Sequence, residues 1–60
     1  MDVIFEFTTI GPYTKVTAID TDSMIEVSIN GPASAGETVL KSQALRRLEY
    51  VMKKKATQGC

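Results

Sequence analysis

Hydrophobic and polar residues alternate along the first half of the chain in a way that is typical of β-strands. The run VIFEFTTI, at about residues 3–10, is rich in β-branched and aromatic residues and stops at the turn dipeptide Gly11-Pro12. The same chemistry resumes at about residues 13–19 and stops at Asp20–Ser23, whose short polar side chains favour a turn. A third run, MIEVSIN at about residues 24–30, alternates strictly. The pattern predicts three strands, and their short connections predict an antiparallel meander.

The second half of the chain has the apolar spacing of an α-helix. The stretch ALRRLEYVMKKK lacks glycine and proline and consists mostly of good helix formers. We predict a helix from about residue 35 to residue 55, followed by a frayed tail at 56–60. At roughly 100° per residue, one side of this helix collects six apolar residues: Leu40, Ala44, Leu45, Leu48, Val51 and Met52. The predicted fold is therefore α+β with the order β-β-β-α, in which one C-terminal helix packs on one face of a three-stranded sheet in a single domain of 60 residues.

The alternation also divides the strand residues between the two faces of the sheet. We expect the helix to cover Val3, Phe5, Phe7, Val16, Ala18, Ile25, Val27 and Ile29. The opposite side, called the open face below, carries Ile4, Ile10, Tyr13, Ile19 and Met24 among Glu6, Lys15, Thr17, Glu26 and Ser28. These apolar residues are more than a purely solvated sheet surface needs, which predicts that the open face meets a protein partner or a second copy of the chain. The alternative is that they are the ordinary exposed apolar residues of a small protein.

The stretch GPASAGET, residues 31–38, has the two glycines of a phosphate-binding loop. However, Glu37 stands where that loop needs lysine, and Pro32 has no N–H group to offer a phosphate. The same letters suit the start of a helix, because Ser34 and Glu37 have the Ser-x-x-Glu spacing of a capping box. We therefore expect residues 31–38 to have a structural role.

Composition removes most catalytic chemistry. The chain has no histidine, and its single cysteine, Cys60, is the last residue, which we interpret as an incidental thiol in the tail. Histidine bases, Ser-His and Cys-His pairs and Cys/His zinc sites are thus excluded within one chain. We expect no enzyme activity, no cofactor, no bound metal and no identifiable small-molecule substrate.

Acidic residues offer two weaker candidates. Asp20, Asp22 and Glu26 lie close together in the sequence, loosely as in a calcium loop, but the mid-loop glycine is missing and a hairpin turn fits better. Glu6 and Glu26 share the open face, where paired carboxylates could do acid/base work. Solvated strand residues are the favoured interpretation.

The chain shows no sign of membrane insertion or export. No apolar run approaches the roughly 20 residues of a membrane helix, and the N-terminal MDVIFEF does not have the form of a signal peptide. We expect a cytoplasmic protein.

Charge is segregated along the chain although the net charge is zero. Residues 1–37 contain six acidic residues and one lysine, whereas residues 38–60 contain six basic residues and one glutamate. The outward side of the predicted helix forms a basic strip around an aromatic residue, made of Arg46, Arg47, Tyr50, Lys53 and Lys54. This basic strip could bind nucleic acid, an acidic protein or a membrane surface, although cations near a helix C-terminus also have a purely structural benefit.

Several segments together resemble a known family. VIFEF, YTKVTAID, EVSINGPA and ALRRLEYVMKKK are similar to a family of short uncharacterised bacterial proteins, mostly alphaproteobacterial, classed as a domain of unknown function. The resemblance runs from Val3 to Lys55 and implies a free-standing small protein. It implies no activity, cofactor or catalytic residue.

Overall fold

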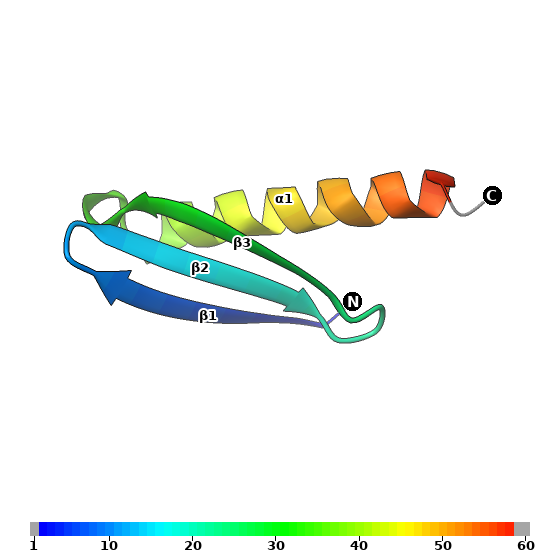
Figure 1. Cartoon of the computed structure of the whole chain (residues 1–60), viewed down its shortest axis with the longest axis horizontal. Coiled ribbons are helices and arrows are strands. Elements are labelled where there is room, and N and C mark those ends of the chain that lie inside the picture. Colours follow the sequence, from blue (N-terminus) through cyan, green and yellow to red (C-terminus); the bar gives the residue numbers. More distant parts are fainter. Residues whose placement is uncertain (1, 59–60) are drawn as a thin grey trace.

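The protein is a three-stranded sheet with one long helix on one face. The computed structural model describes the backbone of residues 2–58 and the side chains of residues 2–55. The order of its strands and helices confirms the predicted β-β-β-α fold. The elements, in chain order, are the strands β1 (Val3–Ile10), β2 (Tyr13–Asp20) and β3 (Ile25–Pro32), the short 3-10 helix η1 (Ala33–Ala35) and the helix α1 (Glu37–Gln58) (Figure 1).

The sheet is antiparallel, with the strand order β1-β2-β3. All eight residues of β1 pair with β2 without a break, from Val3 opposite Asp20 to Ile10 opposite Tyr13. The third strand begins and ends later than the alternation predicted, because Met24 lies in the turn with a φ of 61° and Pro32 still pairs with Tyr13.

The start of α1 differs from the predicted capping box. Ser34 lies within η1, and α1 begins only at Glu37. No hydrogen bond joins Ser34 and Glu37, both of which the structure describes. Gly36 occupies the position before the helix with a φ of 88°, and its carbonyl accepts a hydrogen bond from Leu40 N at 3.2 Å. A positive φ of this kind favours glycine, so backbone geometry rather than a serine side chain sets the start of the helix.

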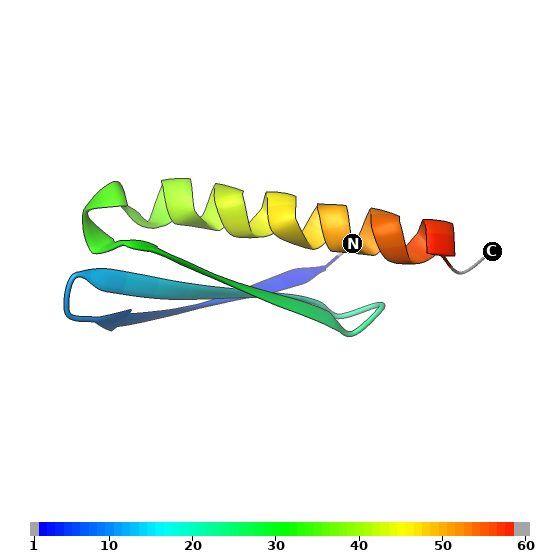
Figure 2. The same ribbon diagram turned by 45° about the horizontal axis from the view of Figure 1, so that its top comes forward.

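The helix continues beyond its predicted end. Residues 56–58 were expected in the frayed tail, yet α1 runs to Gln58, since neither glycine nor proline interrupts residues 37–58. The rest of the predicted tail, with Cys60, lies outside the described residues. At about 1.5 Å per residue α1 is longer than the strands, and both views show its last turns extending past the β2–β3 turn (Figures 1 and 2).

The core lies between α1 and the two strands β2 and β3, on which the helix chiefly packs. The buried cluster consists of Val16, Ala18, Val27, Leu40, Ala44 and Leu48. Leu45, which was predicted on the same side of the helix, is only half-buried and lies outside this cluster. One close approach fixes the helix on the sheet: Gly31 lies directly under Leu40, and a Cβ at position 31 would collide with the leucine side chain.

α1 has neither the apolar content nor the low charge of a membrane-crossing helix, and it is the one long helix in the part of the chain described.

Candidate interaction surfaces

The open face has apolar residues at both ends and polar residues in the middle. The register places Ile4 opposite Ile19 at one end and Ile10 opposite Tyr13 at the other. These two pairs lie six residues apart along β1, which is about 20 Å at 3.3 Å per residue. Ile4, Ile10 and Tyr13 are 51%, 73% and 63% exposed. The predicted interface is therefore two separate apolar pairs rather than one patch.

Met24 does not belong to the open face. It was predicted at the start of the third strand, but it lies in the β2–β3 turn with a positive φ, where it is 75% exposed. Its exposure suits a role at the surface, but its position in the turn places it outside the three paired strands.

The middle of the open face is polar, and its two glutamates are not neighbours. Glu6 on β1 lies opposite Thr17, and Glu26 on β3 lies opposite Ile19. The intervening β2 separates β1 from β3 by two strand spacings, or roughly 9–10 Å. Between the apolar ends, Thr17 and Ser28 share a hydrogen bond of 3.2 Å across β2 and β3. The pairing register therefore does not set the two glutamates side by side, as a carboxylate pair for acid/base work requires.

The face under α1 is only partly covered. Val3, Phe5 and Phe7 of β1 pack against the core cluster as predicted, but each remains half-buried. The ammonium of Lys41 lies 5.0 Å from the ring centroid of Phe5, so a cation also lies over this ring. We call Val3, Phe5 and Phe7 the β1 flank. Sequence reasoning missed its partial exposure, although a three-stranded sheet is roughly 14 Å wide at about 4.8 Å per strand, which is more than the roughly 10 Å width of one helix.

The basic strip has an aromatic residue at its centre. Tyr50 is 57% exposed, and its ring centroid lies 5.9 Å from the Arg47 guanidinium carbon and 6.0 Å from the Lys54 ammonium. A shallow hollow of about 320 Å³ is lined by Arg47, Tyr50, Val51, Lys54 and Lys55. The structure thus brings three of the five predicted residues together, while Arg46 and Lys53 are exposed on the same helix outside this hollow.

A buried carboxylate holds the β2–β3 turn. Asp20, the last residue of β2, is 1% exposed, and its Oδ2 accepts hydrogen bonds from Ser23 Oγ at 2.6 Å and from Ser23 N at 3.1 Å. The hydrogen bond from the Ser23 side chain is the main cause that lowers the pKa of Asp20, and it outweighs the opposing effect of burial. Oδ1 of Asp20 is buried without a hydrogen-bond partner among the described residues. The sequence indicated a turn here, but the acidic spacing alone gave no sign that Asp20 points into the core side of the sheet.

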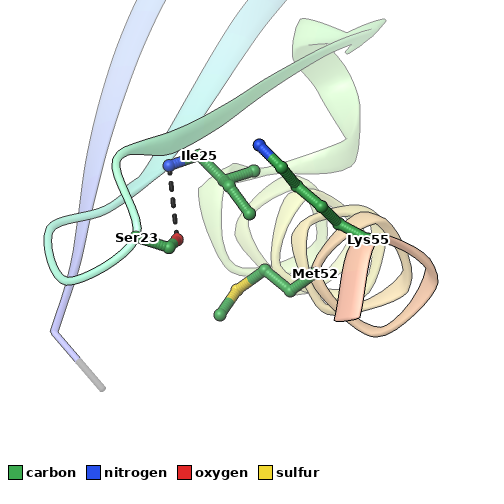
Figure 3. Close-up of a pocket in the computed structure, with 4 residues that line it drawn as sticks. All are labelled: Ser23, Ile25, Met52 and Lys55. Carbon is green, nitrogen blue, oxygen red and sulfur yellow. Dashed lines mark hydrogen bonds between the residues drawn. The ribbon is translucent and has the colours of Figure 1, made fainter. Parts of the chain in front are cut away.

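A second hollow lies beside this turn, between β3 and the end of α1 (Figure 3). It measures about 340 Å³ and is lined by Ser23, Ile25, Met52 and Lys55. Lys55 extends from α1 toward Ile25, and Met52 points toward the turn (Figure 3). The Ser23 hydroxyl accepts a hydrogen bond from Ile25 N at 3.3 Å and donates to Asp20, so it is already engaged. Within residues 2–55, no three His, Cys, Asp or Glu side chains are close enough to hold a metal. The lining of this hollow therefore contains no such metal-binding group.

Comparison with known proteins gives a family whose description names no activity. A family model described as a domain of unknown function (DUF6898) matches residues 1–55 of the chain. No curated protein and no solved structure shows a significant match.

Proposed function

Because this chain belongs to the DUF6898 family, whose description names no activity, we propose its function from its surfaces. The chain acts as a non-enzymatic protein-interaction module. It binds a protein partner or a second copy of itself through the open face of its sheet, using Ile4, Ile10, Tyr13 and Ile19.

The exposure of large apolar side chains on strands carries this proposal. Ile10 and Tyr13 lie opposite each other at the β1–β2 turn, and both are more than 60% exposed. Burying an isoleucine side chain against a partner contributes roughly 1.5–3 kcal/mol. An antiparallel sheet covered on one side needs no such residues on its solvated side, so their presence favours an interface.

Capture of the tagged protein from a lysate of its own cells, with and without nuclease, tests the proposal. We expect a protein that is recovered in both samples and lost when Ile10→Asp replaces an exposed apolar side chain on the open face. Asn30→Asp is the matched control, because it introduces the same charge on the same face, opposite Lys15 and in the row next to Ile10–Tyr13 rather than within an apolar pair. Equal recovery by the wild type and Ile10→Asp would refute binding through the open face.

The basic strip supports a second candidate, nucleic-acid binding. Arg47 and Lys54 flank Tyr50, and an aromatic ring between cations suits a stacked base with its phosphates. Titration of a labelled single-stranded oligonucleotide at several salt concentrations tests it. Binding through phosphates weakens steeply with salt and is lost in the double variant Arg46→Glu, Arg47→Glu. Lys15→Glu, which reverses a single charge on the sheet, is the control for charge reversal away from the basic strip, and binding that survives the double variant would refute this candidate.

A further inference from the structure

The outer edge of β1 is not protected against pairing with another strand. Edge strands of stable monomers are usually short, bulged, interrupted by proline or rich in lysine. By contrast, β1 has eight residues in unbroken register with β2, contains no proline, and carries Glu6 as its one charged residue. The other edge strand, β3, ends in Gly31 and Pro32.

The side chains beside this edge are also incompletely covered. The β1 flank is half-buried because α1 lies chiefly over β2 and β3. A strand added next to β1 would place its own side chains beside Phe5 and Phe7. Both the backbone and the apolar side chains of β1 thus favour strand addition.

We infer that the partner at this edge is a second copy of the chain, whose β1 pairs antiparallel with β1 across a two-fold axis at Phe7. This inference rests on the proposed function, because it names a second copy as the partner, and it places the contact at the edge of the open face, where Ile4 and Ile10 of the two copies meet. The axis is perpendicular to the sheet, so both helices lie on the same side of one six-stranded sheet.

A second copy is the partner that we favour because one register of β1 with β1 sets compatible residues opposite each other. Centred on Phe7, it sets Ile4 of each copy opposite Ile10 of the other, and Glu6 opposite Thr8. Centring on Glu6 sets two glutamates directly opposite each other, which is destabilising. Centring on Phe5 or on Thr8 pairs Glu6 with an isoleucine and shortens the paired segment. An axis between two residues would set residues of the open face opposite residues of the covered face, which the pleat of an antiparallel pair does not allow.

The same register explains why the open face has two separate apolar pairs. In each half of the dimer, the pair Ile4–Ile19 of one copy becomes adjacent to the pair Ile10–Tyr13 of the other. Four apolar side chains then form a continuous row across four strands, and the two-fold axis makes a second row. The dimer therefore assembles on its open face the apolar surface that one copy carries in two parts.

Mixed-cysteine cross-linking tests the register. With Cys60→Ser removing the native thiol, Glu6→Cys and Thr8→Cys are made as separate proteins, both at exposed positions. Opposite residues of an antiparallel pair have Cα atoms about 4.5–5.5 Å apart, within the range of a disulfide. We expect oxidation to give a covalent dimer only when the two proteins are mixed. A dimer formed by Glu6→Cys alone would refute this register, and no dimer in the mixture would refute β1 pairing.

A pair of charge variants at Thr8 provides an independent measurement by sedimentation. Across the dimer, Thr8→Lys faces Glu6 of the other copy and should tighten association several-fold, whereas Thr8→Glu should weaken it several-fold. Within one copy Thr8 lies opposite Lys15, so the effects on the stability of the fold have the opposite sign. If both variants changed association in the same direction as stability, β1 pairing would be wrong.

The outcomes also separate this inference from the proposed function. A wild-type protein that stays monomeric, yet loses a captured partner through Ile10→Asp, would refute the dimer and leave the interaction module standing. A dimer that cross-links as expected, with no other protein captured, supports both and identifies the second copy as the partner.

Discussion

The two edge strands of this small sheet have the same length and different surroundings. β1 and β3 each have eight residues, and each turns apolar side chains toward α1. On β3 the central Val27 is 9% exposed, with Ile25 and Ile29 half-buried on either side of it. On β1, by contrast, no residue of the β1 flank is buried. The difference arises because α1 follows β3 after only η1 and Gly36, and therefore folds back over β3 and β2. Alternation thus determines which face a side chain occupies, and chain connectivity determines whether that face is covered.

Two leucines of α1 give the largest test of this comparison. Leu48 is fully buried in the core cluster and Leu45 is half-buried outside it. We expect Leu48→Ala to reduce the free energy of unfolding by about 2–5 kcal/mol, and Leu45→Ala to reduce it clearly less because less surface loses contact. Urea denaturation of both variants measures the difference. Equal losses would show that Leu45 is packed as fully as Leu48.

A substitution on the β3 side tests the close contact between sheet and helix. Gly31→Ala places a methyl group against Leu40, and we expect a loss of about 1–3 kcal/mol from overpacking. Asn30→Ala, the preceding exposed position, is the control and should change stability by about 0.5 kcal/mol or less. Thermal unfolding of the two variants measures this, and a neutral Gly31→Ala would mean that α1 can move away from β3 without cost.

Acid should destabilise the fold at Asp20. This residue lies between Val3 of β1 and Ile25 of β3, in a row of residues that crosses all three strands. Its pKa in the folded protein is below the ordinary value of 3.8, so the folded state binds protons less readily than the unfolded chain. The stabilisation is present above that ordinary value and is lost as the pH falls through the lower, folded pKa. We expect a smaller effect than loss of core packing, seen as a melting temperature that falls below about pH 4. Ser23→Ala removes the main cause of the shift and should flatten this dependence, and an unchanged acid profile would contradict the assignment.

The smallest expected effect concerns the cation over the β1 flank. Replacing Lys41 with glutamine removes the charge that lies over Phe5, and we expect a loss of about 0.5–1 kcal/mol at this partly exposed site. Arg46→Gln also removes one positive charge, at an exposed position of α1, and provides a comparison. Chemical denaturation measures both. A larger loss for Arg46→Gln would mean that Lys41 contributes little to covering β1.

Sequence patterns predicted the elements of this fold because alternation and helical spacing are local properties. They placed Val16, Ala18, Leu40 and Leu48 in the core, where the structure has them. They wrongly predicted a capping box at Ser34 and Glu37, because the helix begins directly after Gly36, whose positive φ sets the start without a side-chain cap. The candidate surfaces were predicted less completely, since the separation of Ile4–Ile19 from Ile10–Tyr13 depends on the pairing register. Asp20 was assigned to a turn, and its burial depends on a residue row that spans all three strands.

The order of the elements has a consequence for how the chain folds. β1 pairs with β2, β2 pairs with β3, and α1 packs beside the strand that precedes it, so most pairings join neighbouring segments of the chain. Closing short loops loses little chain entropy, and topologies with mainly local contacts fold fast. We therefore expect rapid two-state kinetics, with the β2–β3 hairpin and the first turns of α1 forming a common nucleus. The pairing of β1 with β2 then forms late. β1, the strand with the unprotected edge, is therefore the last strand to pair within the sheet.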